Sequence, residues 1–159
     1  MRDRPVEFRY GEFMVSTNRG QLDLDAVHEL VLTTLEGGDM SRETLELAVE
    51  NSVCFGVYDV QDLLIGFGRA VTDLATYAYL TNIILDTEYR GQGLGRWLVE
   101  CMTSHPDLVA LNRIALVTLN ARGFYEALGF GSGPGTLTYM ELPDSVTRTS
   151  PHSDGRVKT

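Results

Sequence analysis

The segment that most constrains the fold runs from residue 83 to residue 96 and reads IILDTEYRGQGLGR. An apolar stretch gives way to glycines at every second position, and a helical pattern follows. Glycines let the backbone turn with its N–H groups pointing inward and let a ligand approach closely. A helix that begins there adds a partial positive charge. Because Arg90 and Arg96 flank the glycines with charges suited to phosphate oxygens, the segment predicts a pyrophosphate-binding loop.

The spacing of the glycines separates the kinds of loop that this segment could form. A Walker loop needs a Lys directly after its last glycine, and the only Lys of this chain is Lys158. A dinucleotide-binding loop needs GxGxxG and an acidic residue about 20 residues further on. The segment has GxGxG instead, and residues 111–113 contain no acid. A turn that merely joins a strand to a helix remains as the alternative to a phosphate-binding loop.

Hydrophobic patterning around the loop predicts a mixed α+β or α/β sheet with helices on its faces. Asp23 and Ser41 are N-cap residues ahead of two helical patterns, and residues 94–102 form an amphipathic stripe. A last helix is expected from Ala121, with Gly129 in the C′ position. Strands are predicted for six stretches: Phe8–Ser16, Val53–Tyr58, Leu63–Val71, Tyr77–Leu85, Ile114–Leu119 and Leu137–Leu142.

The charge balance excludes several classes of partner. The chain of 159 residues has a formal net charge of -9, which argues against general nucleic-acid binding and against docking on an anionic membrane. No apolar run approaches the roughly 18 residues of a membrane span, and the first ten residues lack the apolar stretch of a signal peptide. Cys54 and Cys101 are predicted to be buried thiols in a reducing compartment, so we expect a cytoplasmic protein. The histidines lack zinc-ligand spacing, and we predict no metal site.

Two motifs resemble the GNAT superfamily of N-acetyltransferases. Residues 90–95, RGQGLG, look like that family's (Q/R)xxGx(G/A) loop, which binds the pyrophosphate of acetyl-CoA, and residues 124–130, FYEALGF, look like its (F/L)YxxxGF helix. The resemblance implies a GNAT-like acyl-CoA N-acyltransferase fold: a central mixed, twisted sheet with helices on both faces, in which the strand ahead of the loop and the next strand splay apart. It implies one acetyltransferase domain over residues 1–142. The composition of residues 143–159 predicts a disordered tail.

The resemblance also implies a set of residues that bind the cosubstrate acetyl-CoA. Backbone N–H groups of the loop would hold the pyrophosphate, Arg90 would support it, and the preceding strand would present main-chain groups to the pantetheine arm and the acetyl carbonyl. The family often has Asn seven residues before its tyrosine; that position is Thr118, and Asn120 lies five residues before it, so either residue could serve. The full set is Ile83, Ile84, Leu85, Arg90, Gly91, Gln92, Gly93, Leu94, Gly95, Arg96, Thr118 and Asn120.

Tyr125 matches the family tyrosine that protonates the departing CoA thiolate, and an ordinary core aromatic is its alternative interpretation. The general base is less evident, because Thr81 and Asn82 occupy the positions where many relatives carry a carboxylate. A water chain, or an acid from elsewhere such as Asp73 or Glu36, would have to take the proton, although Asp73 also fits a plain turn residue.

The acceptor side is expected around the loop at residues 35–40 and one face of the strand before the glycines. Tyr77 and Tyr79 share that face, where they are either substrate contacts or core residues.

These residues predict an N-acetyltransferase that moves an acetyl group from acetyl-CoA to a primary amine of a small molecule or peptide. Direct attack in a ternary complex is expected, because neither cysteine is placed as a nucleophile. The alternative is a non-catalytic acyl-CoA-binding sensor or interaction module on the same fold, which the missing strand carboxylate favours. We expect no nucleic-acid or membrane partner; family members are often dimers, so a homodimer is a family expectation.

Overall fold

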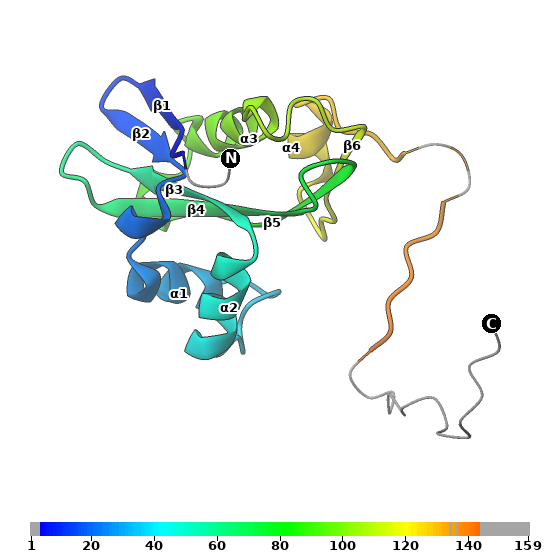
Figure 1. Ribbon diagram of the computed structural model, residues 1–159, viewed down its shortest axis with the longest axis horizontal. Coiled ribbons are helices and arrows are strands. Elements are labelled where there is room, and N and C mark those ends of the chain that lie inside the picture. Colours follow the sequence, from blue (N-terminus) through cyan, green and yellow to red (C-terminus); the bar gives the residue numbers. More distant parts are fainter. Residues whose placement is uncertain (1–3, 134, 136, 144–159) are drawn as a thin grey trace.

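The computed structural model describes residues 4–133, 135 and 137–143, and a single sheet runs through its centre (Figure 1). The strands lie in the order β1-β2-β3-β4-β5-β6. Pairs from β1 to β5 are antiparallel, and β5 pairs with β6 in parallel, so the sheet is mixed as the sequence predicts. The strands are β1 (Glu7–Tyr10), β2 (Phe13–Ser16), β3 (Val53–Tyr58), β4 (Leu64–Thr72), β5 (Tyr77–Leu85) and β6 (Arg113–Ala115).

Helices cover both faces of this sheet. In Figure 1, α1 (Leu24–Leu32) and α2 (Arg42–Glu50) lie on one face, and α3 (Leu94–Ser104) and α4 (Arg122–Glu126) lie on the other. The expected caps are present: the Asp23 carboxylate accepts bonds from the first N–H groups of α1, and the Ser41 hydroxyl accepts one at α2. Each face has its own apolar cluster, which holds the helices to the sheet. Two 3-10 turns complete the structure, η1 (Arg19–Gln21) and η2 (Thr87–Tyr89).

Three predicted strands differ from the structure. The stretch Phe8–Ser16 is a hairpin, because Gly11 turns the chain with φ 56° and separates β1 from β2. The strand predicted at Ile114–Leu119 is limited to β6, which ends at Ala115. The strand predicted at Leu137–Leu142 is wrong: residues 137–143 form no strand and are not part of the sheet (orange in Figure 1). Alternating apolar residues do not form a strand where no edge pairs with them.

The last helix ends as its sequence predicts. The Gly129 N–H bonds to the Glu126 carbonyl, and the Phe130 N–H bonds to the Tyr125 carbonyl. These two bonds, with φ 95° at Gly129, form a Schellman motif, which places Gly129 at C′. The motif turns the chain at Gly129, and one of its two bonds is accepted by the main-chain oxygen of Tyr125. The predicted tail, residues 143–159, lies outside the described residues beyond Pro143.

The strands β5 and β6 separate after a short contact. They pair only at Tyr77–Tyr79 with Arg113–Ala115, although β5 continues for six more residues. Within the described chain, no strand pairs with Leu80–Leu85 on this side. The predicted splay is therefore present, and it leaves an opening in the sheet beside the end of β5.

Candidate active site

The glycine loop lies between the end of β5 and the start of α3, as predicted. Gly91 and Gly93 have φ values of 80° and 81°, a left-handed conformation that glycine adopts without strain. A Cβ atom at either position would meet nothing within 4 Å, so the space in front of the loop is open. Gly93 is the N-cap of α3, and in the described structure no side chain caps this helix and no acid lies in its first turn. The first N–H groups of α3 are thus available to an anion.

The two arginines that flank the loop have different partners. The Nε of Arg90 donates to the main-chain oxygen of Leu85 at 3.2 Å, which fixes the side chain against the end of β5. Arg96 lies one helical turn before Glu100 and forms an exposed ion pair with it, with 3.0 Å between Nε and Oε1. An exposed pair of this kind is weak and leaves Arg96 able to change partner.

Hydrogen bonds to β4 and to the turn between β3 and β4 hold the start of the loop. The main-chain N–H of Asp86 bonds to the Ile65 oxygen in β4 at 2.8 Å, and the Tyr89 hydroxyl donates to the Asp59 carboxylate at 3.0 Å. Asp59 is buried and also accepts main-chain bonds from Gln61 and Leu63. These bonds lower the pKa of Asp59, so the carboxylate remains charged and holds Tyr89 at neutral pH. The turn between β3 and β4 therefore supports the glycine loop.

Near its end β5 contains a bulge, where Gly68 of β4 faces both Asn82 and Ile83. The bulge changes the face to which alternate side chains point. Leu80 packs in the cluster with α3, whereas Ile84 packs in the cluster with α1 and α2. The predicted contact segment, Ile83 to Leu85, thus follows a break in the strand, at the place where β6 has left the sheet.

A pocket of about 930 Å³ lies against the start of β5, where it pairs with β6, and against α4 and the segments around it; neither Leu80–Leu85 nor the glycine loop lines it. Tyr77, Tyr79, Thr118 and Tyr125 all line it, whereas Asn120 is exposed and does not. Thr118 accepts a bond from the Ala121 N–H at 3.0 Å and so supports the start of α4. The structure brings Thr118, not Asn120, to the pocket.

Tyr125 is half-buried between two aromatic rings. Its ring centroid lies 4.9 Å from that of Phe124 and 5.9 Å from that of Phe130, both edge-on. Burial raises the pKa of Tyr125, and the negative charge of Glu36 raises it further. Tyr125 therefore keeps its proton at neutral pH and is able to donate it. Phe124 also approaches α3, since a Cβ at Gly95 would lie 3.8 Å from its ring, so α4 and the glycine loop are neighbours.

The charge of Glu36 contributes to the raised pKa of two pocket tyrosines, Tyr79 and Tyr125. Glu36 is exposed in the loop between α1 and α2, and after burial it is the next cause that raises the pKa of Tyr79. His28 fixes this loop, because its Nε2 lies 2.7 Å from the Met40 oxygen. Of the two carboxylates that the sequence suggested, Glu36 is the one whose charge contributes to the raised pKa of both Tyr79 and Tyr125.

Asp73 is used by the turn before β5. Its carboxylate accepts the Thr76 hydroxyl at 2.6 Å and the main-chain N–H groups of Ala75, Thr76 and Tyr77. The Thr76 hydroxyl bond and these main-chain bonds hold the pKa of Asp73 far below its usual range. The structure therefore places Asp73 as a turn residue, a weak proton acceptor.

Some pocket residues were not singled out by the sequence. Arg113, Phe130 and Tyr139 line the pocket with the four predicted residues. Phe130 belongs to the second motif, so the sequence did indicate that it lies near Tyr125. Nothing in the sequence indicated that Arg113 and Tyr139 would line the pocket, because their positions depend on how distant segments pack.

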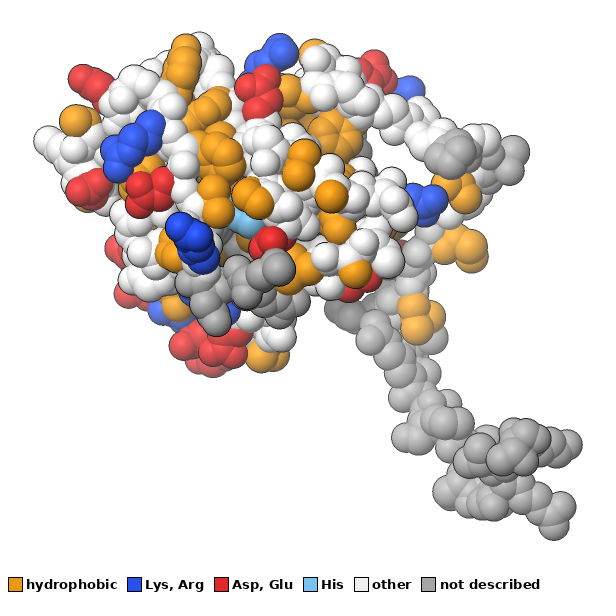
Figure 2. Space-filling view, turned by 45° about the horizontal axis from the view of Figure 1, so that its top comes forward, with side chains coloured by type: hydrophobic (Ala, Val, Ile, Leu, Met, Phe, Trp, Pro, Cys, Tyr) orange, Lys and Arg blue, Asp and Glu red, His pale blue; other side chains and the backbone are white. Residues whose placement is uncertain are grey.

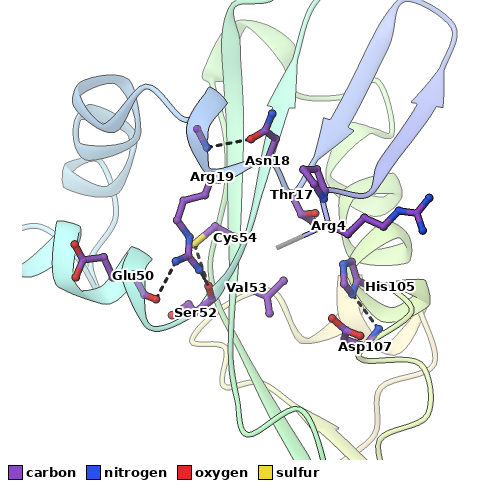
Figure 3. Close-up of a pocket in the computed structure, with 12 residues that line it drawn as sticks. Arg4, Thr17, Asn18, Arg19, Glu50, Ser52, Val53, Cys54, His105 and Asp107 are labelled. Carbon is purple, nitrogen blue, oxygen red and sulfur yellow. Dashed lines mark hydrogen bonds between the residues drawn. The ribbon is translucent and has the colours of Figure 1, made fainter. Parts of the chain in front are cut away.

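A second cavity, of about 300 Å³, lies between the ends of α2 and α3 (Figure 3). Its polar groups already bond to the protein: Arg19 donates to the main-chain oxygens of Glu50 and Ser52, and His105 Nδ1 accepts from the Asp107 N–H. None of the predicted site residues lines this cavity.

The surface in Figure 2 carries basic side chains singly, among acidic and apolar ones. Within the part of the chain that the structure describes, no three His, Cys, Asp or Glu side chains gather as a metal site would require. Among the same residues, no helix has the length and apolar character needed to cross a membrane.

Comparison with known proteins gives a consistent result. Residues 50–131, more than half of the chain, match the family described as Acetyltransferase (GNAT) domain. A crystal structure from Xanthomonas campestris pv. campestris, described as belonging to the GNAT family, matches with a TM-score of 0.74 and 32% identity over 82% of this chain and 94% of that chain. The Gibberella zeae protein named "Putative acetyltransferase FG08082" is 26% identical over 162 residues, covering 87% of each chain.

A more distant structure shares the fold alone. Glucosamine-6-phosphate N-acetyltransferase from Arabidopsis thaliana matches with a TM-score of 0.59 and 16% identity, over 80% of this chain and 97% of that chain. With the splayed sheet, the glycine loop and the family match in place, this chain belongs to the GNAT family of acetyltransferases.

Proposed function

We propose that this protein transfers an acetyl group from acetyl-CoA to a primary amine of a small molecule or peptide, by direct attack in a ternary complex. One observation carries the proposal: β5 and β6 separate after Tyr79 beside an open glycine loop, and Tyr125 lies next to that loop, because Phe124 approaches Gly95 and packs on the Tyr125 ring. This arrangement makes an anion site and a proton donor neighbours. Acyl transfer from a thioester can use both.

The glycine loop supports binding of the pyrophosphate of acetyl-CoA. The left-handed Gly91 and Gly93 leave room for phosphate oxygens, and the main-chain N–H groups from Gln92 to Arg96 would donate to them. Arg90, fixed on the Leu85 oxygen, adds positive charge at the entrance.

The end of β5 supports the reaction itself. In the proposed step, the amine lone pair forms a bond to the thioester carbonyl carbon, and the main-chain groups of Ile83–Leu85 stabilise the charge on the carbonyl oxygen. The C–S bond then breaks, and the sulfur leaves with its electron pair and takes the Tyr125 hydroxyl proton. The amide nitrogen loses one proton to solvent, from which Tyr125 is reprotonated.

The cysteines support direct attack rather than an acyl-enzyme. Cys54 and Cys101 are both buried, and burial raises the pKa of Cys54 to about 11 and that of Cys101 to about 12. Thiols with such pKa values are poor nucleophiles at neutral pH. Neither cysteine lines the pocket at Tyr125.

Glu36 is the proposed carboxylate for the acceptor. An amine is mostly protonated at neutral pH and must lose a proton before attack. Glu36 would attract the ammonium form to the tyrosine-lined side of the pocket and receive the proton directly or through water.

The proposal is tested by measuring CoA-thiol release from acetyl-CoA over a panel of primary amines. With an acceptor found, Tyr125→Phe is expected to lower kcat by about 100-fold, a typical loss for a general acid. Tyr10→Phe, at an exposed tyrosine on β1, is the matched control and should keep the wild-type rate.

Two outcomes would contradict the proposal. If saturating acetyl-CoA leaves the melting temperature of the wild type unchanged, the loop does not bind this substrate. If acetyl-CoA binds but no amine accelerates thiol release, the protein is the non-catalytic acyl-CoA-binding module instead.

A further inference from the structure

A hydrogen-bonded chain connects α2 to the bulge in β5. The Nε of Arg69 in β4 donates to Oδ1 of Asn82 at 3.1 Å, and a terminal nitrogen of Arg69 donates to the Ser52 hydroxyl at 3.0 Å. The Ser52 hydroxyl in turn donates to the Ala48 oxygen in α2 at 2.7 Å. The Arg69 guanidinium thus bridges a helix and the break in the neighbouring strand.

Asn82, which accepts the bond from Arg69, has a left-handed backbone conformation. It has φ 51° and is one of three residues other than glycine with positive φ in the described chain. Its side chain is 6% exposed, in the middle of the sheet. Asn tolerates the left-handed region better than most residues, and strained residues in this region persist where surrounding contacts hold them. The contact that holds Asn82 is the bond from Arg69.

Arg69 is an unusual residue for the interior of a sheet. It is partly buried, burial lowers its pKa, and no described carboxylate forms an ion pair with it. A buried charge without a counter-charge is costly and is retained where its hydrogen bonds are needed. Its two donated bonds are to the bulge and to the serine behind it.

We propose that Arg69 and Asn82 are positioning residues, which hold the bulge so that the main-chain groups of Ile83–Leu85 meet the acetyl group of acetyl-CoA. This inference rests on the proposed function, because it assumes that acetyl-CoA occupies the opening beside β5. The two side chains act through the backbone of β5 and have no contact with the pyrophosphate loop. Removing them should therefore weaken recognition of the acetyl group and leave recognition of the rest of CoA intact.

The test compares acetyl-CoA with CoA by titration calorimetry on the full chain. Asn82→Gly keeps a backbone that tolerates positive φ and removes the bond to Arg69; Arg69→Met removes the same bond from the other side. In each variant the Kd for acetyl-CoA should rise by about fivefold to tenfold, the value of one hydrogen bond, and the Kd for CoA by less than about twofold. The double variant should lose no more than Arg69→Met alone, because that variant already removes the bond to Asn82 together with the bond to Ser52.

Leu74→Gly is the matched control. Leu74 has φ 61° in the turn between β4 and β5, so this variant also places glycine at a left-handed position, at the other end of β5 from the bulge. It should leave both Kd values unchanged. Melting curves of all variants show whether each is folded.

The outcomes separate the two proposals. If the wild type binds neither ligand, the proposed function fails. If the wild type binds both, and the variants lose acetyl-CoA and CoA equally or lose neither, the positioning role of Arg69 and Asn82 is wrong while the proposed function stands.

Discussion

At the scale of single residues, the two carboxylates that the sequence suggested as proton acceptors differ in their hydrogen bonds. Asp73 and Glu36 are both exposed, but Asp73 accepts bonds from one hydroxyl and three main-chain N–H groups of its own turn. The charge of Glu36 instead contributes to the raised pKa of Tyr79 and of Tyr125. The sequence offered both, because spacing alone does not show whether a carboxylate is already occupied by local N–H groups.

Asp73→Asn is expected to change the stability of the protein and not its chemistry. The hydrogen bonds of its turn lower the folded pKa of Asp73, so the carboxylate stabilises the fold above its unfolded pKa of about 3.9, and this contribution is lost as the pH falls through the lower folded pKa. The variant should thus unfold at lower urea than the wild type at pH 7, and the difference should shrink below about pH 4.

The measurement is a set of urea midpoints at several pH values, with Asp62→Asn as the control for removing an exposed acid. Thiol release with a found amine should stay within about twofold of the wild-type rate. A loss near that expected for Tyr125→Phe would make Asp73 the base and contradict its role in the turn.

At the scale of elements, α4 shows how one residue type serves opposite purposes. Gly123 lies inside the helix, where an added Cβ would meet nothing within 4 Å, whereas Gly129 ends the helix with φ 95°. Gly123→Ala should stabilise the protein by about 1 kcal/mol, because alanine has the higher helix propensity. Gly129→Ala should destabilise it by about 1 to 2 kcal/mol, because it forces a side chain into the left-handed region.

The two variants are measured by urea unfolding, and each is the control for the other, since each adds one methyl group in or next to α4. Equal shifts in the same direction would show that the local backbone does not decide the result. Because α4 carries Tyr125, the rate of thiol release should survive Gly123→Ala.

Elements that are determined by residues close together in the chain could be predicted, whereas elements that depend on contacts between distant residues could not. The caps of α1 and α2 and the Schellman motif of α4 are encoded within a few residues, and all are present. At the bulge in β5, Asn82 accepts a bond from Arg69, 13 residues away in the chain, and no pattern in the sequence indicated this contact. The strand expected at Leu137–Leu142 is absent for the same reason, because its formation depends on a distant edge.

At the scale of the whole molecule, the candidate site joins segments that are far apart in the chain. The glycine loop and Tyr125 were predicted because each lies in a motif with its own spacing. That the charge of Glu36 would raise the pKa of Tyr125 followed from no spacing, because the two residues belong to segments far apart in the chain. Motifs therefore predict the proposed acetyl-CoA half of the site, while the proposed amine half depends on the assembled fold.

The net charge of -9 gives the molecule a last testable property. An acidic surface attracts a cationic acceptor over the Debye length, which falls from about 30 Å at 0.01 M salt to about 8 Å at 0.15 M. For an acceptor that is a cation, kcat/KM should therefore fall by roughly threefold or more over this range, because the encounter rate decreases. An amine that is uncharged at the assay pH should show little change.

Glu36→Gln separates the local charge from the global one. If Glu36 provides the charge that draws the ammonium form into the pocket, this variant should raise KM for the cationic amine and reduce the slope of kcat/KM with salt, since one of the charges nearest to the tyrosines is gone. Glu43→Gln, in the first turn of α2, removes an equal charge elsewhere and should leave the slope close to that of the wild type. Equal slopes for the cationic and the uncharged amine would show that the acidity of the chain does not guide the acceptor.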